Sequence, residues 1–334
     1  MSQKLDVLLV GDVVQEDRSL HGSLFDADKP TVAEASSLIG WVEAAGFRVC
    51  GCESVQDFVR SPLRWPKSIV FPLWRGGLSR NRTAVVPAVC EELGIAYVGG
   101  DALVQSLCQD KSVSKSIARD AGFNVSDEWL IRTREELQFF CPSKKLRLPV
   151  VVKPLLTGCS IGISVDSLCK TDGEAQSYAA RLFDKGLGPV LCEEFVEGEE
   201  VSICVVEDDG IVLAKCAATY RDQNGRCPFS SSLFTFDDKM NPASEWTIGK
   251  YELAIPPLDE ALGRLLRTLG KVNLLRIDGR IRGHSFILNE ITPDIHLGMD
   301  SIFLGGFFAA GRSPVSILRD IICAAGSVSR VEGV

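Results

Sequence analysis

Residues 274–299 read LLRIDGRIRGHSFILNEITPDIHLGM, a pattern that predicts two strands joined by a tight polar turn. Arg276 and Asp278 lie two residues apart on the first strand, so their side chains point to the same face. The second strand returns Glu290 beside them. One guanidinium and two carboxylates suit a hard divalent cation placed next to phosphate oxygens. A surface hairpin with an ordinary ion pair would show the same pattern, so the rest of the chain has to decide.

The composition is that of an ordinary globular protein. The chain has 334 residues, of which 46% are hydrophobic and 24% charged, and this length suggests two or three subdomains. The net charge of -8 argues against general nucleic-acid binding. Since no apolar run is long enough to span a membrane and no basic-then-apolar leader opens the chain, we expect a cytoplasmic protein without a membrane partner.

The twelve cysteines are scattered along the chain. Several lie within apolar runs, namely Cys192, Cys204, Cys216 and Cys323. The one close pair, Cys50 and Cys52, has no second pair at zinc spacing. We therefore expect buried thiols in a reducing compartment rather than disulfides or a metal site.

The first hundred residues alternate apolar strands with helices. We expect strands at 4–10, 47–52, 68–73 and 95–98, and helices at 32–45 and 84–93. This alternation predicts a parallel sheet covered by helices, which binds ligands at the carboxyl ends of its strands. Two segments follow such ends: the polar stretch 11–30 and the loop 74–83, which holds Arg75, Arg80 and Arg82. Arginines on loops are often simply solvated, but this position favours an anionic ligand.

The pattern changes after residue 100, where we expect a helix at 102–121 and another that begins at 132–136 with Thr133 as its N-cap. The strand 148–153 ends in Lys153, and a loop of small residues follows at 158–164. A loop of this kind between two strands can fold over phosphates, because its backbone N–H groups point at the oxygens. It is not a Walker P-loop, since no Gly-Lys-Ser/Thr opens a helix here.

Acidic residues and a long polar segment precede the hairpin. Strands are expected at 189–195, 201–206 and 211–217, and the glutamates between the first two could form a solvated turn or present a carboxylate to ribose hydroxyls. The segment 220–250 looks loop-like and contains Lys239. Long loops inside compact domains are often functional lids. A helix at 258–269 leads back to the hairpin.

In this order the motifs resemble the ATP-grasp ligases, and among them the D-alanine–D-alanine ligase branch. The resemblance covers 70–334 well and the first 70 residues only in outline. It is carried by GIAYVGG at 94–100, DKSVSK at 110–115, VVKP at 151–154, CEEFVEGEE at 192–200, RID at 276–278 and NE at 289–290. It implies an α/β (α+β) fold, with an N-terminal Rossmann-like parallel-sheet domain (1–100), a central ATP-grasp subdomain (101–190) and a C-terminal ATP-grasp subdomain with the catalytic hairpin (191–334).

The resemblance also implies ATP and two Mg²⁺ ions as cofactors. Lys111 and Lys153 would hold the α- and β-phosphates, while Gly158 and Ser160 belong to the flap that closes over them. The remaining nucleotide contacts would come from Glu193 and Val196 at the adenine and Glu200 at the ribose. The metal ligands would be Asp278, Glu290 and Thr292.

For the chemistry, the resemblance implies that a carboxylate is phosphorylated to an acyl phosphate, which an amine then attacks to release phosphate. Lys239 would approach the γ-phosphate, Ser160 would assist from the flap, and Arg276 would face the oxyanion of the tetrahedral intermediate. Ser301 would receive the carboxylate of the second substrate. The resemblance further implies a homodimer with small-molecule carboxylate and amine substrates.

The sequence departs from the family in the parts that would bind substrates. The Glu-x-Val-Ser signature that holds the amino group of the first D-alanine is missing, and Lys29 to Thr31 fall in its place by an ungapped count. The loop with Arg75, Arg80 and Arg82 replaces the usual His-Gly…Gly-Glu-Asp-Gly. Further replacements are Cys159 for a flap serine, Met240 for a tyrosine and Thr292 for the metal-binding asparagine.

By this resemblance the phosphate-binding motifs are intact while the substrate loops are altered, which predicts a carboxylate–amine ligase whose substrates are not two D-alanines. Three alternatives stay open. The chain could be a genuine D-alanine–D-alanine ligase with a diverged N-terminus, a nucleotide-binding protein that has lost turnover, or an enzyme that stops at the acyl phosphate.

Overall fold

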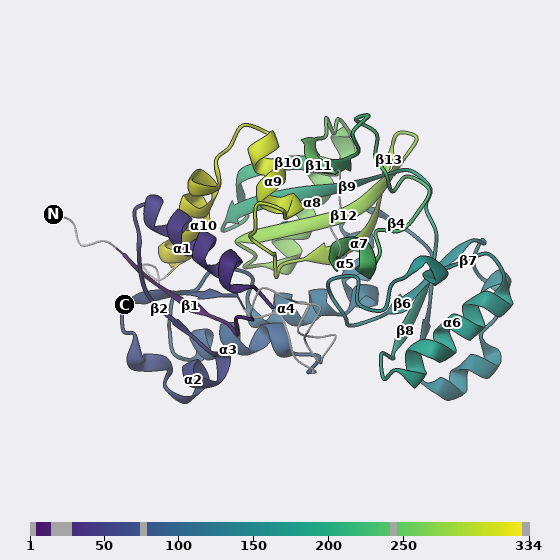
Figure 1. Ribbon diagram of the computed structural model, residues 1–334, viewed down its shortest axis with the longest axis horizontal. Helices are drawn as coiled ribbons and strands as arrows, with labels where there is room; N and C mark the ends of the chain where they lie inside the picture. The colour runs from purple at the N-terminus through teal and green to yellow at the C-terminus, as the bar shows by residue number, and fades with distance from the viewer. Residues whose placement is uncertain (1–4, 15–28, 74–78, 241–245, 329–334) are drawn as a thin grey trace.

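The computed structural model describes residues 5–14, 29–73, 79–240 and 246–328. In these residues the strands form a three-stranded, a six-stranded and a four-stranded sheet. Figure 1 shows the three-stranded and four-stranded sheets at opposite ends of the molecule, with the six-stranded sheet between them.

The N-terminal sheet is parallel, as predicted from the alternation of strands and helices. Its order is β2-β1-β3. The strands are β1 (Asp6–Val10), β2 (Arg48–Glu53) and β3 (Ser68–Pro72), and the helices of this part are α1 (Val32–Ala44), α2 (Val55–Arg60) and α3 (Val85–Glu92). The strand expected at 95–98 is reduced to one bridge between Val70 and Tyr97, because the chain turns away at Gly99, whose φ is +102°.

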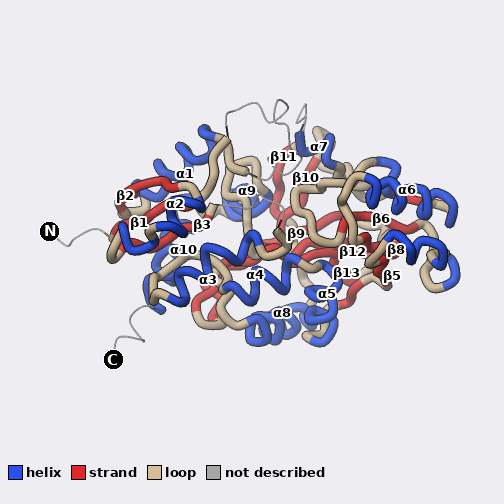
Figure 2. The backbone as a smooth tube through the Cα atoms, turned by 90° about the horizontal axis from the view of Figure 1, so that it is seen from below, coloured by secondary structure: helices blue, strands red, loops and turns tan. Residues whose placement is uncertain are grey.

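The six-stranded sheet carries the hairpin predicted from residues 274–299. In spatial order its strands are β11 (Thr247–Lys250), β10 (Ile211–Arg221), β9 (Glu199–Asp208), β12 (Leu274–Arg282), β13 (Ser285–Thr292) and β4 (Asn124–Val125). On one face, Val201, Ile203 and Val205 pack against α4 (Ala102–Gln109), α5 (Lys111–Asp120) and α8 (Pro256–Leu269), which lie together in Figure 2.

The other face of this sheet is divided between a core and a cavity. Cys204 and Val206 are buried against α9 (Ile302–Ala309) and α10 (Pro314–Val328), in a core that continues to Val7 and Leu9 of the N-terminal sheet. Further along β9, Glu200 and Ser202 point to the same side, because side chains alternate along a strand, and both line the cavity described below.

The four-stranded sheet has its own core. It consists of β5 (Glu128–Ile131), β8 (Val190–Glu194), β6 (Val150–Pro154) and β7 (Leu168–Cys169), covered by α6 (Asp172–Asp184). The division of the chain at residues 100 and 190 stays a prediction. Its second boundary falls at the first residue of β8, which belongs to this four-stranded sheet.

Several local predictions were wrong. The helix expected at 102–121 is broken at Asp110, because this residue is extended and its side chain caps α5 by accepting the N–H groups of Ser112 and Val113 at 3.1 Å. The helix expected from 132 is a 3₁₀ helix, Arg134–Phe139, and Thr133 makes no side-chain cap. The segment 220–250 is more ordered than predicted, since it contains α7 (Phe236–Met240) and β11.

The predictions about cysteines and membrane spans have separate outcomes. Cys192, Cys204 and Cys216 are buried, but Cys323 of α10 is exposed. No disulfide joins cysteines in the part of the chain that the structure describes. None of the described helices combines the length and the apolar character that a membrane span requires.

Candidate nucleotide and substrate site

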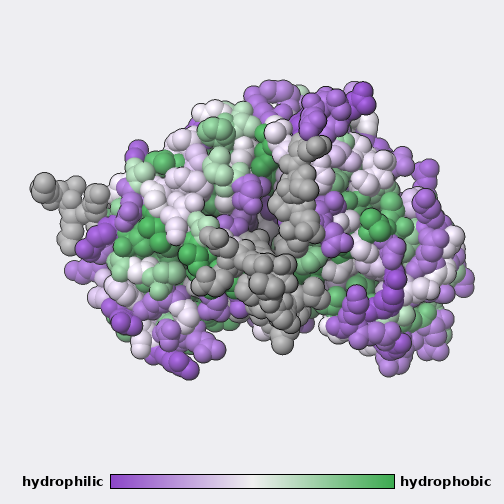
Figure 3. Space-filling model, in the orientation of Figure 1, coloured by the Kyte–Doolittle hydropathy of each residue, from purple (hydrophilic) through white to green (hydrophobic). Residues whose placement is uncertain are grey.

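A cavity of about 660 Å³ lies where the six-stranded sheet, the four-stranded sheet and α9 meet. The surface is hollowed near its centre in Figure 3. Most of the predicted site residues line it, namely Lys29, Arg82, Lys111, Lys153, Gly158, Ser160, Glu193, Val196, Glu200, Lys239, Arg276, Asp278, Glu290, Thr292 and Ser301. Arg80 is exposed and is not part of the described lining. Arg75 and the side chain of Met240 lie outside the described residues.

The hairpin places four polar side chains on one face. Asp278 lies directly opposite Glu290 in the antiparallel register, and Arg276 lies opposite Thr292. Gly279 follows at a β-bulge, where a Cβ would lie 2.5 Å from the carbonyl oxygen of Ile287. A side chain is therefore excluded at this turn of the strand, and the two carboxylates remain side by side above it.

Asp278 is held by two donors. Arg276 donates to it from Nε at 2.9 Å and from Nη2 at 2.8 Å, and Ser202 donates its hydroxyl at 2.6 Å. Burial disfavours the charged guanidinium, but the attraction of Asp278 outweighs it and raises the pKa of Arg276. Arg276 is therefore a fixed positive charge in the cavity wall.

Lys111 lies at the start of α5, directly after the Asp110 cap. Its Nζ is 3.3 Å from Oε1 of Glu290, and it also donates to the carbonyl oxygen of Thr157. Burial lowers the pKa of Lys111, and the nearby cations Lys153 and Arg82 lower it further, so that Glu290 offsets the effect only in part. This local excess of positive charge suits an anionic ligand such as a phosphate chain.

The flap over this part of the cavity has an unusual backbone. Cys159 and Ser160 have φ values of +50° and +53°. At Gly162, φ is +77° and a Cβ would lie 2.6 Å from Cγ of Pro154, so this position requires glycine. The hydroxyl of Ser160 donates to the carbonyl oxygen of Phe234 at 3.0 Å. The flap is thus joined to the segment that leads into α7 and Lys239.

Lys239 was predicted to lie on a long loop, but it belongs to the short helix α7. Its Nζ lies 5.3 Å from the ring centroid of Phe234, and both residues line the cavity. The amine is therefore available on the same side as the flap.

A buried ion network behind the flap was not predicted. Lys115 is fully buried, with Nζ 2.5 Å from Oε2 of Glu193 and 2.7 Å from Oε2 of Glu128, and Lys153 donates to the other oxygen of Glu193. Burial opposes the charge on Glu193, but the two lysines hold its pKa at about 2. The carboxylate of Glu193 therefore positions Lys153, and only its backbone is left for an adenine. The spacing of Lys115 four residues after Lys111 was the sequence signal for this partner.

Glu200 also forms an ion pair with a residue that was not predicted to belong to the site. Its Oε2 is 3.1 Å from Nη2 of Arg280, which lies directly opposite on β12. Burial raises the pKa of Glu200 although Arg280 opposes this shift. Arg280 continues the alternation of Arg276 and Asp278, so this spacing was the available signal.

Comparisons with known proteins identify the family of this chain. A family model described as D-ala D-ala ligase C-terminus matches residues 119–322. A D-alanine–D-alanine ligase of Corynebacterium urealyticum is 30% identical over 271 residues, which cover 77% of this chain and 69% of that protein. The chain belongs to the D-alanine–D-alanine ligase family.

Two further comparisons concern the whole length of the protein. An uncharacterized protein of Sinorhizobium fredii is 24% identical over 313 residues, 86% of each chain. The crystal structure of a D-alanine–D-alanine ligase from Bacillus anthracis complexed with ATP covers 98% of this chain and 100% of its own, with a TM-score of 0.73 and 18% identity. This confirms the predicted ATP-grasp fold. The chain spans only 59% of the length of several other curated ligases that it matches.

Members of the D-alanine–D-alanine ligase family are ATP-dependent, ADP-forming ligases, and their cofactors are ATP and Mg²⁺. The residues present here fit both cofactors. Asp278 and Glu290 offer adjacent carboxylate oxygens, the ligands that Mg²⁺ prefers, and Lys111 and Lys153 supply cations for phosphate oxygens. When bound, Mg²⁺ neutralises charge on the transferred phosphoryl group.

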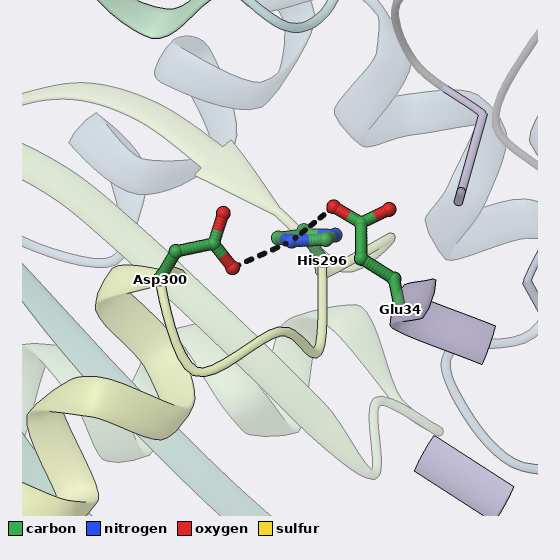
Figure 4. Close-up of side chains that lie close together, drawn as sticks. All are labelled: Glu34, His296 and Asp300. Carbon is green, nitrogen blue, oxygen red and sulfur yellow. Dashed lines mark hydrogen bonds and ion pairs between the residues drawn. The ribbon is translucent and has the colours of Figure 1, made fainter. Parts of the chain in front are cut away.

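A second cluster connects the N-terminal part of this family member to the loop after the hairpin. Nε2 of His296 lies 3.4 Å from Oε1 of Glu34 on α1 and 3.2 Å from Oδ1 of Asp300 (Figure 4). The other oxygen of Glu34 accepts the N–H of Thr31 at 2.6 Å and so caps α1. His296 and Asp300 line the cavity. Asp300 therefore contributes a carboxylate to the cavity wall, whereas Glu34 is not part of the described lining and contacts His296; this cluster was not predicted.

Proposed function

We propose that this chain forms an amide between a small carboxylic acid and an amine through an acyl phosphate, and that its substrates are not two D-alanines. The carboxylate oxygen of the donor attacks the γ-phosphorus, and ADP leaves. The amine nitrogen then attacks the acyl carbon, the carbon–oxygen bond to phosphate breaks, and inorganic phosphate leaves with the proton that the amine loses. The observation that carries this proposal is the convergence of Lys111, Arg276, Asp278 and Glu290 on one wall of the cavity.

The residues of the chain divide the work. Lys111 and Lys153 bind the α- and β-phosphates, and the flap around Gly158 and Ser160 covers them. Lys239 approaches the γ-phosphate from α7. Arg276 stabilises the oxyanion as the amine attacks, because its charge is fixed by Asp278.

The identity of the donor rests on charge. Lys29 lines the cavity from the loop before α1, and Arg82 is buried in its wall and donates to the carbonyl oxygen of Leu156 at 3.2 Å. A free ammonium beside these cations would be repelled, whereas an extra anionic group would be attracted. The carboxylate of Asp300 also lines the cavity and has the opposite effect, because it attracts an ammonium. We infer a donor that bears an extra negative group or lacks a free α-amine.

The test is phosphate release from ATP and Mg²⁺ across a panel of acids and amines, with amide products identified by mass spectrometry. We expect one acid other than D-alanine to give at least about tenfold higher kcat/KM than D-alanine, which corresponds to ~1.4 kcal/mol. Efficient formation of D-alanyl-D-alanine that is unchanged by Lys29→Ala and Arg82→Ala would contradict the inference about the donor.

One observation favours a second candidate, a nucleotide-binding protein without turnover. Thr292 stands on the metal-binding face opposite Arg276, where a hydroxyl is a weaker ligand than an amide carbonyl. Tight ATP binding with no phosphate release from any substrate pair supports this candidate. A third outcome is an acyl phosphate that hydroxylamine traps as a hydroxamate while no amide is formed. This outcome supports an enzyme that stops at the acyl phosphate.

A further inference from the structure

One part of the cavity wall is apolar and reaches solvent. Met299 is 40% exposed and Phe308 is 60% exposed. Both line the cavity, together with the half-buried Trp246 and Ile248 at the start of β11. We call these four residues the apolar wall. An apolar ligand group that covers such a surface removes it from water, which is favourable.

Contacts between α9 and β11 make the apolar wall continuous. An ideal Cβ on Gly305 would lie 2.5 Å from Cδ1 of Ile248 and 3.2 Å from the carbonyl oxygen of Met299, so Ile248 packs directly on the helix backbone. Trp246 precedes Ile248 by two residues, and its ring centroid is 5.9 Å from that of Phe234. The apolar wall therefore extends from α9 towards the segment that carries Lys239.

The same helix has a polar end in the cavity. Ser301, Gly305 and Phe308 lie on one face of α9, as their spacing requires, and all three line the cavity. The hydroxyl of Ser301 accepts the N–H of Leu304 at 3.3 Å and donates to the carbonyl oxygen of Gly298 at 2.7 Å. A carboxylate at this helix N-terminus would be bound without reacting. Since the donor carboxylate has to reach the γ-phosphate, the carboxylate bound here is that of the acceptor.

We propose that the apolar wall binds the side chain of the acceptor amino acid, and that this acceptor carries a branched aliphatic or aromatic group larger than methyl. The proposal rests on the ligase function proposed above and specifies its second substrate. Ser301 at the N-terminus of α9 would bind the carboxylate, and Phe308 on the same helix face lies in the apolar wall that would contact the side chain.

The experiment compares alanine, leucine, phenylalanine and glutamine as acceptors, in both configurations, with the best donor from the phosphate-release panel. We expect kcat/KM for leucine or phenylalanine to exceed that for alanine and glutamine by about tenfold or more. Phe308→Ser lowers this preference at least about fivefold and leaves the KM for ATP unchanged. Phe139→Ser is the matched control, because Phe139 is 71% exposed and is absent from the described lining of the cavity.

Calorimetric binding of the same amino acids in the presence of a non-hydrolysable ATP analogue gives a readout that does not require turnover. If no pair releases phosphate, the proposed function fails, whereas tighter binding of leucine than alanine that Phe308→Ser abolishes still supports the apolar subsite. Equal binding and equal kcat/KM for alanine and leucine overturn it. It is also overturned if Phe308→Ser changes the sedimentation of the protein and not its acceptor preference, because the wall is then a contact between copies of the chain.

Discussion

At Lys111 the surroundings of a single ammonium indicate the kind of ligand that the site can bind. Burial and the cations Lys153 and Arg82 lower its pKa, and Glu290 compensates only in part. A phosphate chain supplies negative charge beside this group of cations, so its binding should raise the pKa of Lys111. The same argument does not apply to Lys153, whose ammonium is already paired with Glu193.

We expect Lys111→Ala and Lys153→Ala each to weaken ATP binding about ten- to a hundredfold, because each removes a charge-assisted contact worth ~1.5–3 kcal/mol. Isothermal titration calorimetry with ATP measures the effect. Lys215→Ala is the control, since Lys215 pairs with Asp259 on the surface and does not line the described cavity. Unchanged ATP affinity in both cavity variants would contradict the proposal that Lys111 and Lys153 bind phosphates.

Thr292 should make the magnesium requirement of the enzyme unusually high. It faces the cavity beside Asp278 and Glu290, but a hydroxyl is a poorer ligand than the amide that the family uses there. We expect Thr292→Asn to lower the magnesium concentration at half-maximal turnover at least about threefold. Thr292→Val removes the oxygen and should raise it. If neither variant alters the magnesium dependence, Thr292 does not contribute to the metal site.

At the scale of an element, α5 shows how a cap can position a functional side chain. The residue pattern predicts one helix over 102–121, but Asp110 interrupts it. The carboxylate of Asp110 accepts the N–H groups of Ser112 and Val113. This ends α4 and starts α5 at Lys111, so that the lysine points into the cavity from a helix N-terminus.

We expect Asp110→Ala to lower the free energy of unfolding by about 1 kcal/mol and also to weaken ATP binding, because the cap and the position of Lys111 are lost together. Asp101→Ala is the matched control. Asp101 caps α4 by accepting the N–H of Val104 at 2.7 Å, so its loss should cost similar stability without changing ATP affinity. Urea unfolding and calorimetry separate the two effects. Equal ATP affinities in both variants would show that Asp110 has no positioning role.

Strand β8 contributes a pH-dependent part of the stability through Glu193. Its pKa of about 2 lies below the ordinary value of 4.5, so its charge stabilises the folded protein above pH 4.5, and this contribution is lost as the pH falls towards 2. The loss amounts to roughly 3 kcal/mol. Glu193→Gln should remove this pH dependence and lower the free energy of unfolding at pH 7 by roughly 3–5 kcal/mol, because the buried Lys153 loses its charged partner while Lys115 keeps Glu128.

Urea unfolding between pH 7 and pH 3 measures both effects of Glu193→Gln. Glu194→Gln is the control on the same strand, because Glu194 accepts the exposed N–H of Arg147 and is not part of the buried network. If wild type and Glu193→Gln lose stability in parallel below pH 4.5, the lysines do not hold Glu193 in its charged state.

At the scale of the whole molecule, the cavity depends on parts of the chain that lie far apart in sequence. The cluster of Glu34, His296 and Asp300 joins α1 to the loop that follows the hairpin of β12 and β13 (Figure 4). The flap and α7 are joined in the same way by the hydrogen bond from Ser160 to Phe234. The first connection joins the N-terminal part of the chain to the six-stranded sheet, and the second joins the four-stranded sheet to the six-stranded sheet.

Glu34→Gln should raise the KM for the donor about three- to tenfold and leave ATP affinity unchanged. The amide can still cap α1, but the negative charge beside Nε2 of His296 is lost, which costs on the order of 1 kcal/mol. Steady-state kinetics with varied donor measure the effect. The control is Glu43→Gln near the other end of α1, where the side chain is exposed. An unchanged donor KM would show that this contact does not shape the substrate wall.

The sequence by itself determined the elements whose pattern is local. Alternation along one strand placed Arg276 and Asp278 on one face, and the return of Glu290 followed from the tight turn. The parallel sheet followed from the alternation of strands and helices, and the order of the motifs gave the family. These features depend on the periodicity of side chains along strands and helices, which can be recognised from residues close together in the sequence.

Only the tertiary structure decided which charges neutralise one another. Glu193 is bound to Lys115 and Lys153, Glu200 to Arg280, and Glu34 to a histidine that lies 262 positions later in the chain. Arg80 is exposed, although Arg82, two residues later, is buried. The energy of a charge depends on burial and on partners within a few ångströms, and neither is fixed by spacing along the sequence.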